Sequence, residues 1–330
     1  MKGVFTLLIL FFWLAAAHAQ FAPQAGVSGS TAIRSDSSIF VAWATGCQLQ
    51  RGYRDIAVPD SGYATAGADA NGTGPADYLL VSLGDSGVAT LTFAMPLYNG
   101  PGPDFAVFEN GFPDPGDPEE AFLEFAYVEV SSDGNNFYRF PAACYIPDTA
   151  QVPVAGVYTN ARQVNNLAGK YISGFGTPFD LEELSGTPGL NLDHITHIRL
   201  VDVIGSVNEH ASLDTGGRKI NDPYPTNIPT SGFDLDAVGV IHQMAAGLNE
   251  TNTSKPLQVY PNPASGRIFI HSNGLRMITC SLTDVMGKEL RYGTIKGSGS
   301  IDISTLAPGL YYLISHDSEG NKWLEKITKH

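Results

Sequence analysis

The sequence predicts an all-β protein, in which a jelly-roll-like β-sandwich is followed by a small immunoglobulin-like β-sandwich. Three observations lead to this prediction. The chain contains 36 glycines and 21 prolines, while only 16% of its residues are charged. Short apolar segments alternate with turn sequences along most of its length. No long apolar stripe with a helical period of 3.6 residues interrupts them, so antiparallel sheets packed face to face are the expected architecture.

Residues 1–20 read as a signal peptide that is removed from the mature protein. Lys2 supplies the positive start, an apolar stretch follows, and the small-residue sequence "AHA" precedes Gln20. The apolar stretch is about ten residues long, which is too short for a stable membrane anchor. No later segment approaches the roughly 18 apolar residues of a transmembrane helix. We therefore expect an exported, soluble chain without a transmembrane segment.

The remaining length suffices for two domains, each with its own core. A polar, proline-terminated segment over residues 246–255 reads as a linker between them. The first domain is then expected over residues 21–245 and the second over residues 256–330. The second contains alternating apolar and polar residues separated by Asn-Pro, Ser-Gly, Met-Gly and Pro-Gly turns, which is typical of a small antiparallel sandwich.

The net charge of −14 is unevenly distributed. Residues 21–250 contain 9 basic and 27 acidic side chains, whereas residues 251–330 contain 9 basic and 6 acidic ones. An acidic first domain repels nucleic acid and anionic lipid, so neither is an expected partner. This charge is compatible with cation binding, with neutral ligands such as sugars, or with a simple role in solubility.

Cysteine usage leaves one question open. The three cysteines are Cys47, Cys144 and Cys280. An oxidising compartment permits a bridge between Cys47 and Cys144, which leaves Cys280 alone in the second domain. The chain has no CxxC pair, which disfavours a cysteine zinc site.

The second domain resembles a known secretion address. Its sequence contains "VYPNPASG" at Val259–Gly266, "DVMGKEL" at Asp284–Leu290, "LAPGLYYL" at Leu306–Leu313, and a basic end at Lys326 and Lys329. These motifs resemble the C-terminal sorting domain of the Bacteroidetes type IX secretion system. The resemblance implies handling by the type IX machinery, removal of the domain at the outer membrane, and attachment of the rest to surface lipopolysaccharide. The expected location is the outer-membrane cell surface of a Gram-negative bacterium, or the exterior.

The first domain reads as a series of short strands. The segment "YVEVSSDGNNFYRF" has the pattern of a β-hairpin, and "LEEL" at 181–184 that of one helical turn. The hairpin and "THIRLVDV" resemble parts of galactose-binding-like jelly rolls. The set "VSLGDSG", "NGPGPDFAVFENGF", "GFGTPFDL", "DPYPT" and "GFDLDAVGV" resembles an uncharacterised group of bacterial cell-surface proteins. This resemblance implies a fold and a location, but no activity.

Several acidic residues at strand ends are candidate metal ligands. Asp104, Glu109 and Asn110 flank the apolar strand "FAVF", while Asp234 and Asp236 lie two residues apart, which would point both to one face of a strand. Calcium takes six to eight oxygen ligands of these types. We therefore formulate the hypothesis that these five residues hold a structural calcium ion. The alternative is that the same side chains cap strands and turns.

Three tyrosines in turn-rich loops are candidate ligand-binding residues: Tyr53, Tyr63 and Tyr224. Exposed aromatic rings can stack on sugar faces, whereas packing against their own loops is the ordinary alternative.

The sequence thus favours a cell-surface binding or adhesion protein, stabilised by calcium and directed to glycans or matrix. One alternative is a polysaccharide hydrolase that pairs Glu109 with Glu129 or with Asp236. Another is a structural envelope protein without a small ligand. The nucleophile-elbow, phosphate-loop, dinucleotide and HExxH zinc motifs are all absent from the sequence.

Overall fold

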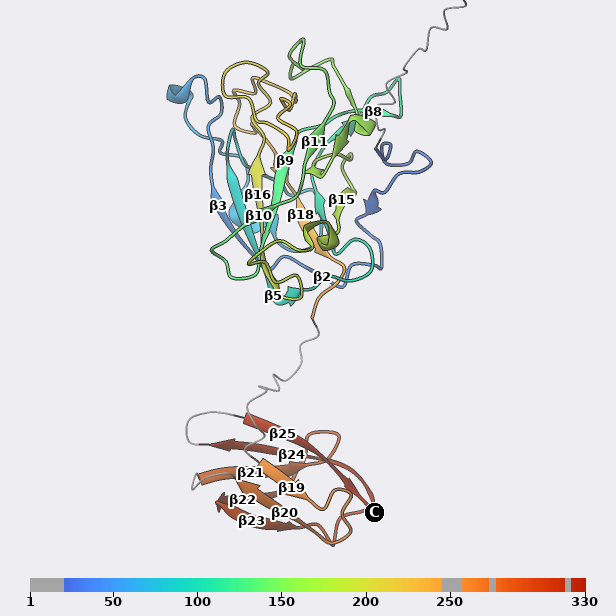
Figure 1. Cartoon of the computed structure of the whole chain (residues 1–330), viewed down its shortest axis with the longest axis vertical. Helices are drawn as coiled ribbons and strands as arrows, with labels where there is room; N and C mark the ends of the chain where they lie inside the picture. The colour runs from blue at the N-terminus through green and yellow to red at the C-terminus, as the bar shows by residue number, and fades with distance from the viewer. Residues whose placement is uncertain (1–20, 245–256, 273–276, 318–321) are drawn as a thin grey trace, which may run out of the picture. The chain divides into compact units, whose positions relative to one another are not determined.

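The computed structural model describes residues 21–244, 257–272, 277–317 and 322–330. The predicted signal peptide (1–20) and linker (246–255) lie outside the described residues. By its contacts the chain divides into two compact units, Met1–Ala245 and Ala246–His330. The predicted all-β class is confirmed (Figure 1): the helical elements of the described parts are 3-10 turns of three or four residues.

Two antiparallel sheets form the sandwich of the N-terminal unit. The first has the strand order β1 (Ile33–Arg34), β15 (Phe175–Phe179), β6 (Phe105–Phe108), β18 (Ala237–Val240) and β2 (Ala42–Trp43). The second has the order β10 (Tyr138–Arg139), β9 (Ala126–Ser131), β16 (Ile195–Asp202), β5 (Val88–Leu97) and β3 (Gly46–Gln50), with β14 (Leu167–Ala168) also paired to β9. Most neighbouring strands are far apart in the sequence, as in a jelly roll.

The main core lies between these sheets. Alternate residues of β9 and β16 pack inward against residues of β6 and β18, since successive side chains of a strand point to opposite faces. Phe105 of β6 lies at its centre, with its ring stacked on Phe179 at a centroid distance of 5.3 Å and edge-on to Phe140 at 6.0 Å. A second core, which includes Leu123, Phe125 and Val164, covers the outer side of β9.

Short strand pairs complete the N-terminal unit. They are β4 (Val81–Ser82) with β17 (Asp234–Leu235), β11 (Ala143–Cys144) with β13 (Val164–Asn165), and β8 (Glu120–Phe122) between β7 (Phe112–Pro113) and β12 (Thr159–Asn160). The 3-10 turns are η1 (Pro59–Ser61), η2 (Asp69–Gly72), η3 (Ala161–Gln163) and η4 (Leu181–Leu184). In Figure 1 the long blue, green and yellow loops lie at one end of this unit. The last described residues of the unit lie at its opposite end.

The local predictions for this unit are confirmed at the hairpin and the helical turn. β9 and β10 pair antiparallel with Tyr138 opposite Val130. The carboxylate of Asp133 accepts hydrogen bonds from two backbone N–H groups in the turn between them. The sequence "LEEL" forms η4, and Asp180 caps it by accepting a hydrogen bond from the N–H of Glu182 at 2.9 Å.

The cysteine bridge that an oxidising compartment would permit is not formed. Cys47 lies in β3, Cys144 in β11 and Cys280 in the C-terminal unit, and all three are free thiols. Cys47 and Cys144 belong to different sheets, so the fold does not bring them together. Burial raises the pKa of both thiols to about 11, which keeps them protonated and unreactive.

The C-terminal unit is a smaller sandwich. One sheet has the order β19 (Leu257–Tyr260), β20 (Arg267–Ser272), β23 (Ser298–Asp302), and the other β22 (Glu289–Lys296), β21 (Met277–Thr283), β24 (Gly309–Asp317), β25 (Lys322–Lys329). Residues of β20 alternate between exposed and buried, which puts Ile268 and Ile270 into a core shared with Leu282 and Leu313.

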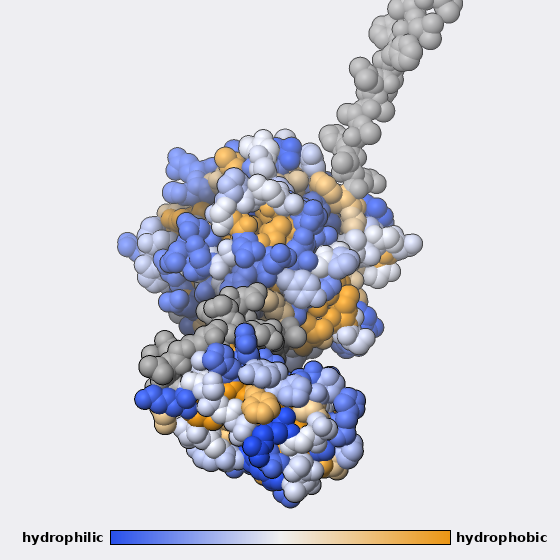
Figure 2. Space-filling model, turned by 60° about the horizontal axis from the view of Figure 1, so that its bottom comes forward, coloured by the Kyte–Doolittle hydropathy of each residue, from blue (hydrophilic) through white to orange (hydrophobic). Residues whose placement is uncertain are grey.

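Within the described residues, the structure contains no helix long and apolar enough to cross a membrane. Figure 2 shows largely hydrophilic surfaces on both units, with hydrophobic residues confined to patches.

We expect Phe105→Ala to destabilise the N-terminal unit by about 3–5 kcal/mol, because it leaves a cavity between two further rings. Calorimetry of the mature chain measures the effect. Val41→Ala is the control, since Val41 is 64% exposed and its truncation is expected to change stability by about 0.5 kcal/mol or less. Equal effects of the two substitutions would contradict the described core.

Candidate functional site

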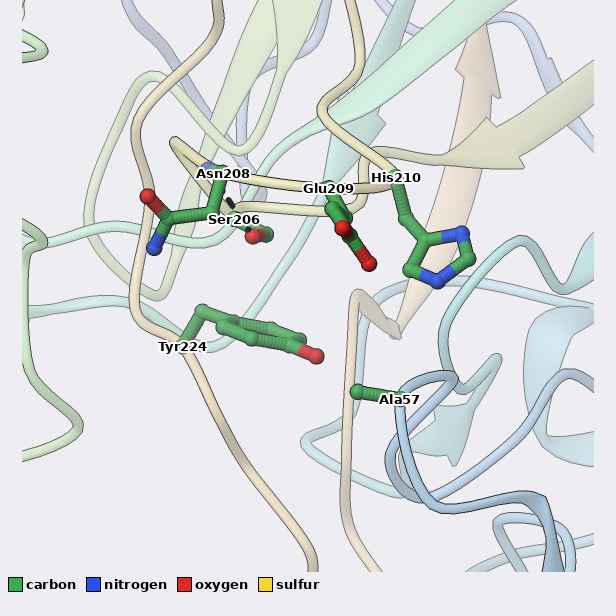
Figure 3. A pocket seen from close by; sticks show the side chains of 6 residues that line it. All are labelled: Ala57, Ser206, Asn208, Glu209, His210 and Tyr224. Atoms are coloured by element: carbon green, nitrogen blue, oxygen red, sulfur yellow. Dashed lines mark hydrogen bonds between the residues drawn. The ribbon is translucent and has the colours of Figure 1, made fainter.

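An open pocket lies among the loops of the N-terminal unit. It has a volume of about 610 Å³ and is lined by Ala57, Ser206, Asn208, Glu209, His210 and Tyr224. Figure 3 shows the ring of Tyr224 along one side, with the side chains of Glu209 and His210 pointing toward the same space. Most of the lining residues belong to the segment 203–232, between β16 and β17, and Ala57 comes from the segment before η1.

Buried amides hold the pocket loops in place. Asn221 accepts a hydrogen bond from the N–H of Val152 at 3.0 Å and donates to the carbonyl oxygens of Pro147 and Ala150. Gln151 accepts a hydrogen bond from the N–H of Val207 at 2.9 Å. Because these bonds satisfy buried polar groups, the loop is a folded part of the unit with a defined shape.

The three predicted ligand-binding tyrosines lie in connected loops. The hydroxyl of Tyr224 donates to Asp55 at 2.8 Å, and Asp55 also accepts from the N–H of Ala57. Tyr53 and Tyr63 are stacked with ring centroids 4.9 Å apart, and Tyr63 is 53% exposed. The segment 53–63 therefore contains Tyr53 and Tyr63, and its Asp55 accepts the hydrogen bond of Tyr224. Tyr224 lines the pocket, whereas Tyr53 and Tyr63 do not.

The structure brings together three of the five predicted cation ligands. The amide of Asn110 donates to Asp234 at 3.0 Å, and the Ser82 hydroxyl donates to the other oxygen of that carboxylate. Glu109 is close enough for the charge of Asp234 to act on it. Glu109 and Asn110 follow β6, while Asp234 begins β17.

Asp104 and Asp236 lie elsewhere. Asp104 precedes β6, at the other end of that strand, and accepts hydrogen bonds from the N–H groups of Gly100 and Leu181 and interacts with His242, each at 2.7 Å. Asp236 accepts from the N–H groups of Asp77 and Tyr78. The five residues therefore do not surround one centre, and these two carboxylates bind turn backbones, the alternative left open by the sequence.

The spacing of Asp234 and Asp236 predicts that both point to one face of a single strand, and this prediction is wrong. Asp234 belongs to β17, which pairs with β4, and β18 begins after Asp236 in the five-stranded sheet. The chain passes from one sheet to another between them, so their carboxylates have different partners.

Sequence reasoning missed other acids at this end of the sandwich. Glu124 precedes β9, Asp222 lies in the pocket loop, and Asp85 precedes β5; all three are buried. Asp202 ends β16, and its carboxylate accepts hydrogen bonds from the N–H groups of Ser86 and Phe233. No spacing in the sequence links these positions, since their proximity arises only when the strands assemble.

Burial and like charge both act on these acids. Burial raises the pKa of Glu109 well above its usual value, and the charges of Asp234 and Asp222 raise it further. Burial also raises the pKa of Glu124, with added repulsion from Glu109, Asp234, Asp222 and Asp202. Burial raises the pKa values of Asp85 and Asp234 to about 6. The cluster therefore holds protons more strongly than ordinary carboxyls.

Among the described residues, no group of three or more His, Cys, Asp and Glu side chains has the geometry to hold a metal ion. Glu129, a candidate catalytic acid, is paired with Arg139 and Arg199 at 2.8 and 2.5 Å. These ion pairs join β9 to its two neighbouring strands, so Glu129 has a clear structural role.

The comparisons identify the C-terminal unit. Residues 258–330 match the secretion system C-terminal sorting domain. This match supports cargo of the type IX system, and indicates secretion to the cell surface or the exterior in Bacteroidetes. No curated protein sequence matches the chain at a significant level. The resemblance of the first domain to a group of bacterial surface proteins stays a prediction.

Solved structures give only distant similarity. A β-glucuronidase from Ruminococcus gnavus in complex with C6-substituted uronic isofagomine is 10% identical, with a TM-score of 0.20 over 86% of this chain and 46% of that chain. The BSP domain of a biofilm associated protein is also 10% identical, with a TM-score of 0.20 over 88% of this chain and 51% of that one. The chain spans about half the length of these structures, and such TM-scores carry no argument about fold or function.

We expect the melting temperature of the N-terminal unit to rise when the pH is lowered from 7.5 to 5 in chelator. Asp85 and Asp234 have pKa values of about 6 when folded, against about 3.9 when unfolded. Their stabilising contribution is therefore complete below about pH 4 and is lost as the pH rises through about 6. Calorimetry of the mature chain, with the C-terminal unit as internal reference, measures the trend; a rise with increasing pH would contradict it.

Proposed function

We propose that residues 21–244 form a cell-surface binding or adhesion domain whose loop pocket binds neutral glycans, either free or as part of a matrix. The observation that carries this proposal is the open pocket in which the ring of Tyr224 lies beside polar side chains (Figure 3). The other side chains that line the pocket also suit a neutral sugar.

A sugar ring offers both apolar C–H faces and hydroxyl groups, and the pocket offers partners for each. Tyr224 supplies an aromatic face held in position by its hydrogen bond to Asp55. Asn208, Glu209 and His210 supply exposed hydrogen-bond donors and acceptors. The stacked pair Tyr53 and Tyr63 offers a further aromatic surface for a longer chain.

The charge of the domain narrows the ligand class. Glu209 lines the pocket, Asp55 is hydrogen-bonded to Tyr224 of the same lining, and Asp85 accepts from the N–H of Ile56, next to Asp55. Anionic polysaccharides would be repelled by this end of the unit, which supports neutral sugars. The hydrolase alternative has less support, because Glu109 is buried and Glu129 is bound by two arginines.

The sorting domain gives the location at which such binding would matter. We further propose that, after removal of residues 256–330, the N-terminal unit is attached to surface lipopolysaccharide. This proposal rests on the resemblance of the sorting domain to its family. The predicted calcium ion is a separate question, because the buried acids are not among the residues that line the pocket.

Tyr224→Ala is expected to weaken glycan binding by the mature chain about 30-fold, the loss typical of an aromatic residue at the centre of a binding site. A glycan array identifies the ligand, and titration calorimetry measures its affinity. Tyr224→Phe keeps the ring but loses the hydrogen bond to Asp55, so it should weaken binding less than Tyr224→Ala does. Tyr158→Ala is the control on the same unit, outside the pocket. Unchanged affinity for Tyr224→Ala would contradict binding in this pocket, and no glycan ligand at all would favour a structural envelope protein.

Deletion of residues 256–330 is expected to keep the exported chain inside the cell envelope, since it removes the secretion address. Cell fractionation and surface labelling measure the location. The full-length chain should appear at the surface as heterogeneous forms of raised mass, and these should vanish in a strain that lacks surface polysaccharide. A truncated chain at the surface would contradict the role of the address, and a single sharp band in both strains would contradict the attachment.

A further inference from the structure

Two buried glutamates at this end of the unit accept fewer hydrogen bonds than Asp202 and Asp234 of the same acidic cluster. Glu109 is only 1% exposed; its Oε2 accepts from the N–H of Gly111 at 2.6 Å, but its Oε1 has no partner. Glu124 is 6% exposed, and the described residues donate no hydrogen bond to its carboxylate. By contrast, both oxygens of Asp202 and both of Asp234 accept hydrogen bonds. An unsatisfied buried carboxylate oxygen is costly, so Oε1 of Glu109 requires a further partner.

The two glutamates lie in neighbouring segments. Phe112 of β7, three residues after Glu109, pairs with Phe122 of β8, two residues before Glu124. The charge of Glu109 is also the largest of those that raise the pKa of Glu124. A Cβ atom built on Gly111 would lie 3.2 Å from Oε2 of Glu109 and 3.3 Å from the side chain of Leu123, the residue before Glu124. The glycine thus permits the turn after β6 to approach the segment before β9.

The charges that raise the pKa of Glu124 are those of Glu109, Asp234, Asp222 and Asp202, and those of Asp85 and Asp222 act on Asp202. His210 acts in the opposite direction on Asp85. The positive charge of Arg51 acts on Asp234, where it opposes the burial that raises the pKa of that carboxyl.

That guanidinium already donates hydrogen bonds to the carbonyl oxygens of Ala66, Ser82 and Gly67. Among the described residues, Arg51 thus makes its hydrogen bonds to carbonyl oxygens and not to the two glutamates. Their charge is relieved either by protons or by a cation from outside the chain.

We propose that Glu109 and Glu124 bind one calcium ion between the ends of the two sheets. The two carboxylates are the direct side-chain ligands, and backbone carbonyl oxygens and water complete the coordination. Calcium accepts such mixed, irregular oxygen sets, whereas magnesium requires near-octahedral geometry. A site with two carboxylates is consistent with the finding that, in the described parts, no three acidic, histidine or cysteine side chains converge as metal ligands.

The ion would link three parts of the unit. Glu109 follows β6 of the first sheet and Glu124 precedes β9 of the second. Asp222, from the pocket loop, accepts a hydrogen bond from the N–H of Phe125 at 3.0 Å, next to Glu124. The ion therefore stabilises the folded unit without touching the glycan pocket, and this inference does not depend on glycan binding.

The experiment measures calcium binding to the mature chain after removal of metals with chelator. At pH 7.5, titration calorimetry should show one ion per chain. At a hundredfold excess over the dissociation constant, calcium should raise the melting temperature of the N-terminal unit by about 5–10 °C. At pH 5 the shift should be much smaller, because protons compete for the same carboxylates.

Two variants locate the site. Glu109→Gln and Glu124→Gln are each expected to weaken calcium binding at least tenfold. Each should melt in chelator at or above the wild-type temperature at pH 7.5, since the change removes repulsion without removing volume. Glu182→Gln, at an exposed glutamate of η4, is the matched control and should bind calcium as the wild type does.

Three outcomes would overturn the proposal. Absence of calcium binding at pH 7.5 would show that the two acids are satisfied by protons alone. Unchanged calcium affinity in both variants would place any ion elsewhere. An equal melting shift with magnesium at the same concentration would overturn the assignment to calcium.

Discussion

The pocket end of the N-terminal unit depends on two hydrogen bonds that the carboxylate of Asp202 accepts. One oxygen accepts a hydrogen bond from the N–H of Phe233 at 2.7 Å, which closes the base of the segment 203–232 that carries most of the pocket. The other accepts from Ser86 at 3.0 Å, in the connection between β4 and β5. Gly232, with a φ of 69°, is required beside it, because a Cβ there would lie 2.6 Å from the carboxylate. One buried acid thus joins the ends of β16 and β17 and shapes the loop between them.

This arrangement explains why so many acids are buried at one end. Loop ends expose backbone N–H groups that no sheet partner satisfies, and a carboxylate can accept two of them at once. Asp202 does so at this end, and Asp104 and Asp236 do so elsewhere in the unit. The cost is mutual repulsion wherever several such ends converge, and it raises the pKa of Glu124 well above its usual value on top of the effect of burial. Protons or a cation relieve this repulsion, which makes the stability of this end depend on solution conditions in a way that the apolar core does not.

The sequence predicts the architecture better than it predicts the site. Alternating residues and turn signals identify β9, β10 and β16 and the sandwich of the C-terminal unit, because side-chain period and turn chemistry are local properties. The strand β15 was not predicted, since Gly176 and Pro178 disfavour a strand and only pairing with β1 and β6 stabilises it. The candidate site depends on contacts such as that of Asp222 with Phe125, 97 residues apart. The period of apolar residues does not show which strand ends lie close together in the fold. The sequence therefore predicted the same ligand role for Asp104 and Glu109, although they lie at opposite ends of β6.

The pocket and the acidic cluster are physically continuous through the same loop. Asp222 hydrogen-bonds the backbone next to Glu124, and Tyr224 lies two residues further along. Gly205 permits this packing, because a Cβ there would overlap an oxygen of Asp222. The ion proposed for Glu109 and Glu124 would act next to the backbone of Phe125 and not on the pocket lining, which includes neither glutamate. Its effect is therefore expected on the stability of this end of the unit, whereas the ring of Tyr224 is held by its own hydrogen bond to Asp55.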